Sequence, residues 1–373
     1  MVNPVKYHLG KFPPQNLIWE KLIPFIGPAS AALARYDGML AAIPNPTILL
    51  TPLFTQEAVL SSRIEGTQAT MGEVLEYEAG VDLEHFSKER KADIQEILNY
   101  RRALNAAEKM LEKLPLCQRI LKEAHNILME GVRGQGKSPG EYRKVPNWIG
   151  PPGCSIDKAK FVPIDAAKLP DAMGKWESFI HEPTLDRLVQ LAILHAEFEA
   201  LHPFLDGNGR LGRMFVPLFL YDGKILQRPM FYISAHLEAK RDEYYERLLS
   251  VSRDDNWTGW CQFFLEAITI QAEDNTKKTK AVLALYERKK DIIAEATHSQ
   301  YSIKALDFLF RRPIFRTSTF AGESGIPAPT AKRILRDLQQ LDFFTIIQEA
   351  SGRRPAVLAF KKLLNAAEGQ DIF

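Results

Sequence analysis

The sequence of 373 residues contains only three cysteines, Cys117, Cys154 and Cys261. They are far apart and form no Cys-x-x-Cys pair, which excludes a disulfide framework and a thiolate zinc site. No stretch approaches the roughly 18 consecutive apolar residues of a membrane-spanning helix. The first residues also lack the basic segment, apolar stretch and small-residue cleavage site of an export signal. We therefore expect a cytoplasmic protein that has no membrane partner.

Charge of a single sign is also absent, since 48 Lys and Arg balance 46 Asp and Glu for a net charge of +2. This balance argues against a histone-like polycation and against an acidic solvating tail. Hydrophobic residues make up 46% of the chain and charged residues 25%, as in ordinary globular proteins. There is no internal repeat or low-complexity tract. The length predicts two or three folded domains.

The pattern of apolar residues predicts a mainly α protein in four parts. We expect an N-terminal helical region at 1–110, a core domain at 111–273, a helical linker at 274–297 and a C-terminal domain at 298–373. Prolines in the first 50 residues predict only short helices there, because proline resists helix interiors. A helix opening near Thr55 should end at Gly66, where a left-handed cap is expected. Amphipathic helices are further expected at 89–113, 116–130, 165–181, 184–200, 208–222 and 238–251.

One interval interrupts the helical pattern. Between Gly134 and Pro163 the chain carries five glycines and five prolines, with Trp148 and Ile149 among its apolar residues. This composition predicts a β-hairpin or an ordered loop. Loops of such length in a compact domain are commonly functional or act as lids.

The segment from His202 to Arg213 combines residues suited to phosphate chemistry. Gly207 and Gly209 allow close approach of the backbone to a ligand where one helix ends and the next begins, and this geometry favours an anion. Arg210 and Arg213 share a helix face and could clamp a di- or triphosphate. The segment also provides Asp206 as a carboxylate suited to Mg²⁺ and His202 as a proton acceptor.

Less specific interpretations of this segment also exist. A Gly-x-Gly turn followed by two arginines is commonly a helix start with a solvated face. A metal-hydrolase centre is a further alternative, because the spacing i, i+4, i+7 and i+11 places His195, Glu199, His202 and Asp206 on one helical face. The order His-Glu-x-x-His is absent, and Pro203 ends the helix before Asp206. We therefore interpret His195 and Glu199 as structural.

The same twelve residues match the signature of the Fic family, His-x-Phe-x-(Asp/Glu)-Gly-Asn-Gly-Arg-x-x-Arg, at every defined position. The chain resembles this family over roughly residues 55–270, with Gly140 to Arg143 and Phe161 to Pro163 similar to the edges of the family's β-hairpin flap. The resemblance implies a helical nucleotidyltransferase that moves AMP from ATP to a hydroxyl side chain of a target protein. It implies His202 as the base, Asp206 as the ligand of Mg²⁺, and ATP contacts from Gly207, Asn208, Gly209, Arg210 and Arg213.

A second match lies upstream, where residues 61 to 66 read Ser-Ser-Arg-Ile-Glu-Gly. This resembles the inhibitory motif of the family, (Ser/Thr)-x-x-x-Glu-(Gly/Asn), with Ser61 and Glu65 at its defined positions. The resemblance implies that Glu65 pairs with Arg213 and excludes the γ-phosphate from its productive position. Some family members use this glutamate to remove AMP, so the reverse reaction is also expected. Taken alone, the motif is more typical of a glutamate on a solvated helix end.

Three further features extend the resemblance. Tyr244 and Tyr245 occupy the place of a tyrosine pair that lines the adenosine pocket of relatives. The flap of relatives pairs with the target segment by strand addition, although the prolines here limit the length of such pairing. A homodimer is the expected assembly.

The C-terminal domain has the helix and strand order of a winged helix-turn-helix, with helices at 302–310, 318–324 and 330–341 and strands at 344–348 and 356–360. Residues 301–362 contain eleven Lys and Arg against five Asp and Glu. Basic and polar residues project from the third helix and the hairpin tip, where a winged helix contacts DNA. They are Lys332, Arg333, Arg336, Gln340, Arg353 and Arg354. Docking of a protein partner is the alternative for this domain.

Two hypotheses follow. The first is a protein adenylyltransferase that uses ATP and Mg²⁺, modifies Ser, Thr or Tyr of target proteins and of itself, and is autoinhibited by Glu65. The second is a DNA-binding transcriptional regulator whose Fic core senses nucleotide. Some relatives transfer UMP, phosphocholine or phosphate, but the presence of both arginines favours a nucleoside triphosphate.

Overall fold

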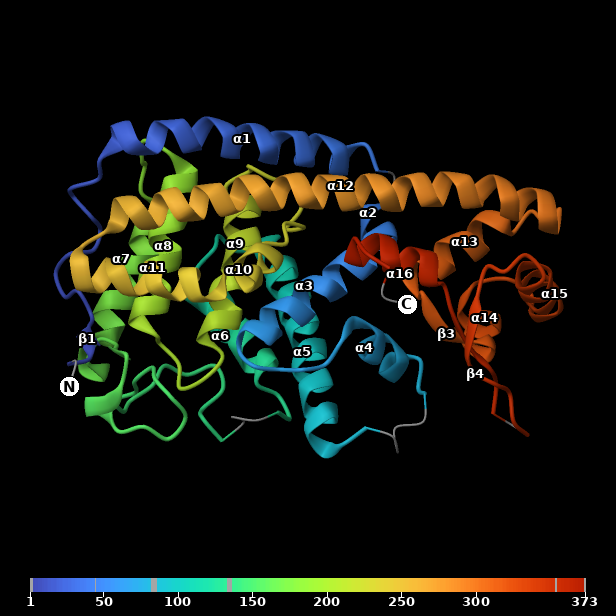
Figure 1. The fold of residues 1–373 in the computed structure, drawn as a ribbon, viewed down its shortest axis with the longest axis horizontal. Coiled ribbons are helices and arrows are strands. Elements are labelled where there is room, and N and C mark those ends of the chain that lie inside the picture. Colours follow the sequence, from blue (N-terminus) through green and yellow to red (C-terminus); the bar gives the residue numbers. More distant parts are fainter. Residues whose placement is uncertain (1–2, 44, 82–85, 133–135, 353, 372–373) are drawn as a thin grey trace. The chain divides into compact units, whose positions relative to one another are not determined.

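The computed structural model describes residues 3–43, 45–81, 86–132, 136–352 and 354–371 (Figure 1). These residues are mainly helical, as the sequence predicts. The chain forms two compact units. Unit 1 comprises Met1–Gly38, Leu60–Thr67 and Leu98–Glu273, and unit 2 comprises Met39–Val59, Gln68–Ile97 and Asp274–Phe373. The four ranges expected from the sequence stay a prediction. Within the described ranges, no helix combines the length and the apolar character needed to cross a membrane.

Unit 1 is organised around α8 (Arg187–Leu201), which is buried along almost its whole length. Asp186 caps its first turn, because the carboxylate accepts hydrogen bonds from the amides of Leu188 and Val189. α7 (Leu169–His181), α9 (Asn208–Asp222) and α11 (Arg241–Asp254) pack around it (Figure 1). Burial of each large apolar side chain contributes roughly 1.5–3 kcal/mol, so this packing holds the α8–α9 connection in place.

Further helices complete unit 1. They are α6 (Gln118–Leu128), the second part of α5 (Lys88–Leu111), the short α10 (Ser234–Ala239) and the first part of α12 (Trp257–Thr297). Of these, α5 and α6 agree with the predicted ranges to within a few residues, whereas α10 is absent from the predictions and α12 begins 17 residues before the expected linker at 274–297. The segment that contains Ser61 and Glu65 lies at the end of α3 (Thr51–Ile64), and Gly66 has a φ of +106°, as its expected capping role requires.

The expectation of short N-terminal helices is wrong. α1 (Trp19–Ala41) is one helix of 23 residues that contains Pro24 and Pro28. Each proline removes one backbone donor, but the helix buries Leu22, Leu33 and other apolar residues, and this packing outweighs the local preference.

The interval at 134–163 is an ordered loop in its described part, from residue 136 onward, and not a regular two-stranded hairpin. One antiparallel bridge joins Ile149 to Phe161. β2 (Phe161–Val162) pairs in parallel with β1 (Val5–Lys6), a pairing that the sequence analysis does not anticipate. Of two short 3-10 turns, η2 (Ile156–Lys158) lies between the two bridge partners, and η3 (Ala166–Lys168) follows β2.

Unit 2 combines helices with a small sheet. Its helices are α2 (Pro46–Leu49), most of α3, α4 (Met71–Glu78), the first part of α5, the second part of α12, α13 (Ser302–Arg311), α14 (Thr317–Glu323), α15 (Ala328–Gln339) and α16 (Lys361–Glu368). β3 (Ile314–Arg316), β5 (Val357–Ala359) and β4 (Thr345–Gln348) form an antiparallel sheet in the order β3-β5-β4. β3 and α16 are absent from the sequence predictions. Phe308, Phe315 and Phe320 pack edge to face or tilted beside the sheet and form part of the core.

Candidate active site

The loop that joins α8 to α9 carries the signature and is shaped by two left-handed residues. His202 follows the end of α8 with φ +46° and ψ +61°. Gly207 has φ +75°, and a Cβ atom there would lie 3.0 Å from Met129 Sδ, so this position requires glycine. α9 then begins at Asn208, and the amides of its first turn have no helical partners. The loop therefore presents donors and a positive helix end to an anion.

Asn208 and Arg143 fix the backbone of this loop. Asn208 Oδ1 accepts a hydrogen bond from Phe204 N, and its Nδ2 donates to Phe204 O, both at 2.8 Å. The buried Arg143 guanidinium donates to His202 O at 2.9 Å and to Leu201 O at 3.3 Å. Asn208 thus holds the loop in place. A contact from the second hydrogen of its side-chain amide to a phosphate stays a prediction.

His202 is half-buried at the site. Its Nδ1 is buried and has no hydrogen-bond partner within the described ranges. Burial lowers the pKa of His202 to about 4, although the nearby Glu65 carboxylate favours the charged form. The imidazole is therefore neutral near pH 7 and able to accept a proton.

Asp206 sits among positive groups. Its Oδ2 is 2.9 Å from Lys137 Nζ, and its Oδ1 accepts a hydrogen bond of 2.7 Å from Gly207 N and lies 3.7 Å from Arg210 Nη2. Although burial opposes ionisation, Lys137 and Arg210 keep the pKa of Asp206 below its ordinary value. Asp206 is thus an ionised carboxylate, about one third exposed, which suits a hard cation.

Arg213 is held from α3, within unit 1. Its Nε donates to Ser61 Oγ at 3.0 Å, and its Nη2 donates to Ser61 O and to Glu65 Oε1, both at 2.7 Å. The guanidinium is 1% exposed, whereas Glu65 is 34% exposed. Burial disfavours the charge, but the Glu65 carboxylate raises the pKa of Arg213 above its ordinary value. Arg213 is therefore charged, and its Nε and Nη2 are engaged by Ser61 and Glu65.

The Glu65 carboxylate also lies against Gly209 in the first turn of α9. A Cβ atom at Gly209 would collide with Glu65 Oε1 and would lie 3.0 Å from Arg213 Nη1. A carboxylate therefore already occupies the cradle in which the sequence places a phosphate. The geometry brings together His202, Asp206, Gly209, Arg213 and Glu65.

The two tyrosines have different environments. Tyr244 is 1% exposed, and its hydroxyl is 2.9 Å from His195 Nε2, so it belongs to the core. Tyr245 is 41% exposed, and its hydroxyl lies 3.5 Å from Ile64 O, next to Glu65 in the chain. Only Tyr245 has a surface available to a ligand at this position.

The metal-hydrolase alternative finds no support in the described part of the chain, where no three His, Cys, Asp or Glu side chains could hold a metal ion together. His195 is buried and its Nδ1 is 3.1 Å from Gly212 O, in agreement with its structural interpretation. Glu199 Oε1 is buried without a hydrogen-bond partner, and burial raises the pKa of Glu199 to about 8. Glu199 is therefore mostly protonated at neutral pH.

Sequence reasoning missed His125, on the inward face of α6. Its Nδ1 accepts a hydrogen bond of 2.8 Å from Gly140 N, so the other nitrogen carries the proton and donates to Asp206 O at 3.0 Å. The ring stacks on Phe204 with centroids 3.8 Å apart, and burial lowers the pKa of His125 to about 4. No motif marks this residue, because a single histidine on an apolar helix face is ordinarily a core residue. It links the loop at 136–140 to the signature loop.

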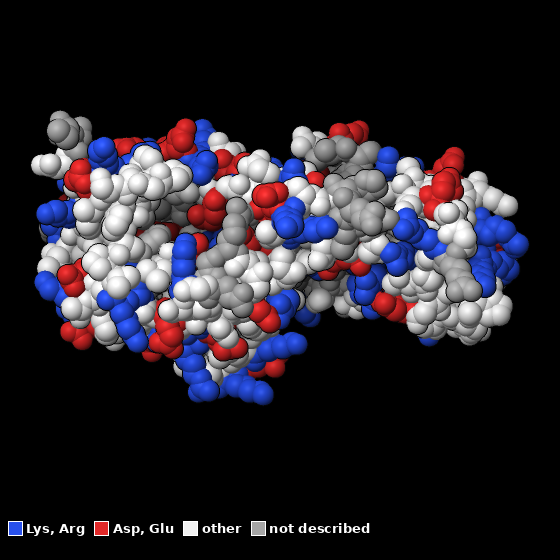
Figure 2. Space-filling view, turned by 90° about the horizontal axis from the view of Figure 1, so that it is seen from below, with Lys and Arg blue, Asp and Glu red and all other residues white. Residues whose placement is uncertain are grey.

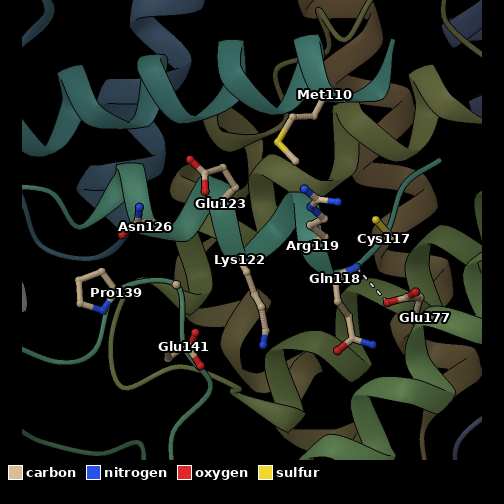
Figure 3. A pocket seen from close by; sticks show the side chains of 11 residues that line it. Met110, Cys117, Gln118, Arg119, Lys122, Glu123, Asn126, Pro139, Glu141 and Glu177 are labelled. Atoms are coloured by element: carbon tan, nitrogen blue, oxygen red, sulfur yellow. Dashed lines mark hydrogen bonds between the residues drawn. The ribbon is translucent and has the colours of Figure 1, made fainter. Parts of the chain in front are cut away.

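A separate open cavity of about 940 Å³ lies in unit 1. Arg119, Lys122 and Glu123 of α6 line it together with Glu141 and Glu177 (Figure 3). None of the signature residues lines this cavity, so it is distinct from the site described above.

Comparisons with known proteins agree with the signature. Residues 23–109 match the domain described as Fic/DOC family N-terminal, and residues 115–220 match the Fic/DOC family domain. A probable protein adenylyltransferase, aq_aa38, from Aquifex aeolicus is 34% identical over 87 residues, which cover 22% of this chain and 27% of that protein. The protein adenylyltransferase Fic of Drosophila melanogaster is 27% identical over 114 residues, covering 30% and 21%. The matched segments thus span about a quarter of the length of these curated relatives.

Solved structures are similar in fold. A Fic family protein from Desulfovibrio desulfuricans G20 has a TM-score of 0.60 at 19% identity, with 93% of this chain and 98% of that chain covered. Fic-1 from C. elegans has a TM-score of 0.51 at 16% identity, with 72% and 74% covered. At these identities the likeness concerns the fold alone.

Proposed function

Because this chain belongs to the Fic/DOC family through both matched domains, we propose that it is a protein adenylyltransferase that moves AMP from ATP to a hydroxyl group of a protein. The observation that carries the proposal is the single loop on which a neutral His202, an ionised Asp206 and the open first turn of α9 meet. Transfer of a phosphoryl-type group needs mainly positioning and neutralisation of charge, and these groups supply both.

In the proposed reaction, the target hydroxyl oxygen forms a bond to the α-phosphorus, and the bond from the α-phosphorus to the bridging oxygen breaks. Pyrophosphate leaves, and the hydroxyl proton passes to His202. The amides at Gly207 to Gly209 and the guanidinium groups of Arg210 and Arg213 bind the phosphate oxygens. Tyr245 is the proposed contact to adenosine.

Asp206 fits a magnesium ion, because Mg²⁺ is commonly bound by one or two carboxylates together with substrate phosphates. When bound, the ion would neutralise charge on the phosphates.

We further propose that Glu65 inhibits the enzyme. Its carboxylate takes one donor of Arg213 and lies against Gly209, so it competes with the γ-phosphate of ATP for the same groups. Release of Glu65 from Arg213 would open the productive site. A freed Glu65 could also orient water for removal of AMP, which is the second reaction proposed for this chain.

A second function, binding of duplex DNA, is proposed for unit 2. Four residues at 324–327 join α14 to α15, and Gly325 among them has φ +68°, as in a helix-turn-helix. With the sheet order β3-β5-β4, this arrangement supports the proposal of a winged helix. On the face seen in Figure 2, Lys and Arg side chains gather over the end of unit 2 that holds α15.

The basic residues of α15 do not have equal roles in this proposal. Arg333 Nη1 donates to Thr297 O at 2.9 Å and pairs with Asp337, so Arg333 anchors α15, contrary to the sequence interpretation that it projects toward DNA. Lys332 and Arg336 are exposed and available to phosphates. Arg354 is exposed at the hairpin tip, and Arg353 lies outside the described residues.

Labelling with ATP that carries the isotope in either the α- or the γ-phosphate tests the main proposal. Label from the α-phosphate, and not from the γ-phosphate, should appear on the protein or a lysate target. The label should increase in Glu65→Gly and disappear in His202→Ala. Transfer of the γ-label instead would identify a kinase and contradict the proposal.

A further inference from the structure

Both carboxylate oxygens of Asp206 already accept a hydrogen bond in this structure. Its Oδ1 accepts from Gly207 N, and its Oδ2 is paired with Lys137 Nζ at 2.9 Å. Lys137 is a compact point charge on a flexible stem, and it therefore offers the carboxylate much of what a divalent cation offers. A cation that binds Oδ2 would compete with this ammonium group for the carboxylate.

The loop that carries Lys137 is built against the signature loop. Gly140 N donates to His125 Nδ1, and His125 donates to the carbonyl oxygen of Asp206 itself. Arg143 N donates to Pro203 O at 2.9 Å, which makes a second backbone link. Three independent contacts, including the Lys137–Asp206 pair, thus connect the two loops.

The backbone next to Lys137 is also specific. Ser138 has a φ of +54°, in the left-handed region that non-glycine residues rarely adopt, and its carbonyl accepts from Glu141 N at 3.1 Å. This turn directly follows Lys137, whose side chain is 50% exposed. An exposed ion pair without such support contributes little.

We propose that Lys137 is a stand-in cation that neutralises Asp206 until metal-bound nucleotide arrives and that gives up Oδ2 at that step. This inference rests on the proposed function, since it assigns Asp206 to the metal of the ATP complex. It adds a residue that no part of the signature contains. Without Lys137, only Gly207 N and Arg210 would offset the charge of Asp206, and more of that charge would face the incoming polyphosphate whenever the metal is absent.

The experiment measures binding of α,β-methylene-ATP, whose α–β linkage is not cleaved, by calorimetry with Mg²⁺ and with EDTA. All variants carry Glu65→Gly, so that Arg213 is available. Lys137→Met should weaken nucleotide binding in EDTA by at least roughly fivefold, which is the lower end of the usual range for coupling between two binding sites. With Mg²⁺ present, the same substitution should change the affinity less than twofold. Lys144→Met, which alters an exposed lysine after the same turn, is the matched control and should change neither value.

A second pair of variants separates this inference from the proposed function. In an Asp206→Asn background, Mg²⁺ should no longer improve binding, and Lys137→Met should have no effect in EDTA. Equal weakening with and without Mg²⁺ in Lys137→Met, or no change at all, would overturn the role of Lys137. Absence of nucleotide binding in Glu65→Gly, or a Mg²⁺ effect that survives Asp206→Asn, would instead contradict the proposed function.

Discussion

Replacement of Glu65 tests how strongly the end of α3 restrains the site. Glu65 Oε1 accepts one charge-assisted hydrogen bond of 2.7 Å from Arg213, and such a bond is worth about 1.5–3 kcal/mol. That range corresponds to roughly 10- to 150-fold in an equilibrium. Because Glu65 is 34% exposed, solvent screening favours the lower part of the range. We expect Glu65→Gly to raise the rate of AMP transfer roughly 10- to 50-fold.

Glu65→Gln refines this prediction, because the amide oxygen still accepts from Arg213 but carries no charge. Its rate should lie between those of the wild type and Glu65→Gly. Initial rates of label transfer from α-labelled ATP measure the effect, and Glu182→Gln, at an exposed position after α7, is the matched control. If Glu65→Gly and Glu65→Gln transfer AMP at the wild-type rate while His202→Ala transfers none, the inhibitory role of Glu65 is wrong.

Four further predictions follow from the geometry. His202→Ala should lower the transfer rate by roughly 10²- to 10⁴-fold with unchanged circular dichroism, as expected for loss of a general base, and near-wild-type transfer would exclude that role. Because burial lowers the pKa of His202 to about 4, the rate in Glu65→Gly should stay level between about pH 8 and pH 6, whereas a base with an ordinary pKa of 6.5 would lose activity there. The pKa of Glu199 is higher in the folded than in the unfolded chain, so the contribution of Glu199 to stability decreases as the pH rises from its ordinary pKa of 4.5 to about 8. The melting temperature of Glu199→Gln relative to wild type should therefore rise across that pH range. A constant difference would contradict the protonated state of Glu199. Replacement of Lys332 and Arg336 by Ala should weaken binding of a DNA duplex and lower the slope of its salt dependence by the equivalent of up to about two phosphate contacts. Lys361→Ala, outside α15, should change neither quantity. Equal loss of binding in both variants would argue against binding through α15.

The sequence predicted those residues of the site that lie close together in the chain. His202, Asp206, Gly207, Gly209 and Arg213 fall within twelve residues, so the α8–α9 connection alone brings them together. Glu65 could be paired with Arg213 only through the resemblance, because 148 residues separate them and packing of α3 decides their contact.

Contacts that depend on tertiary packing were not predictable. His125 and Lys137 approach Asp206 from a distant part of the chain, and neither carries a local signal. The burial of Tyr244, and with it the loss of one expected ATP contact surface, follows from the position of α11 against α8. Similarly, α1 accommodates two prolines because its apolar face is buried, which local propensity does not reveal.

Mass spectrometry of the purified Glu65→Gly protein after incubation with ATP and Mg²⁺ tests the central claim most directly. We predict a mass gain of one AMP group on a Ser, Thr or Tyr side chain, absent when His202→Ala is added to the same protein. No mass gain on the protein or on any lysate protein, or a gain of phosphate alone, would contradict AMP transfer by the His202 loop.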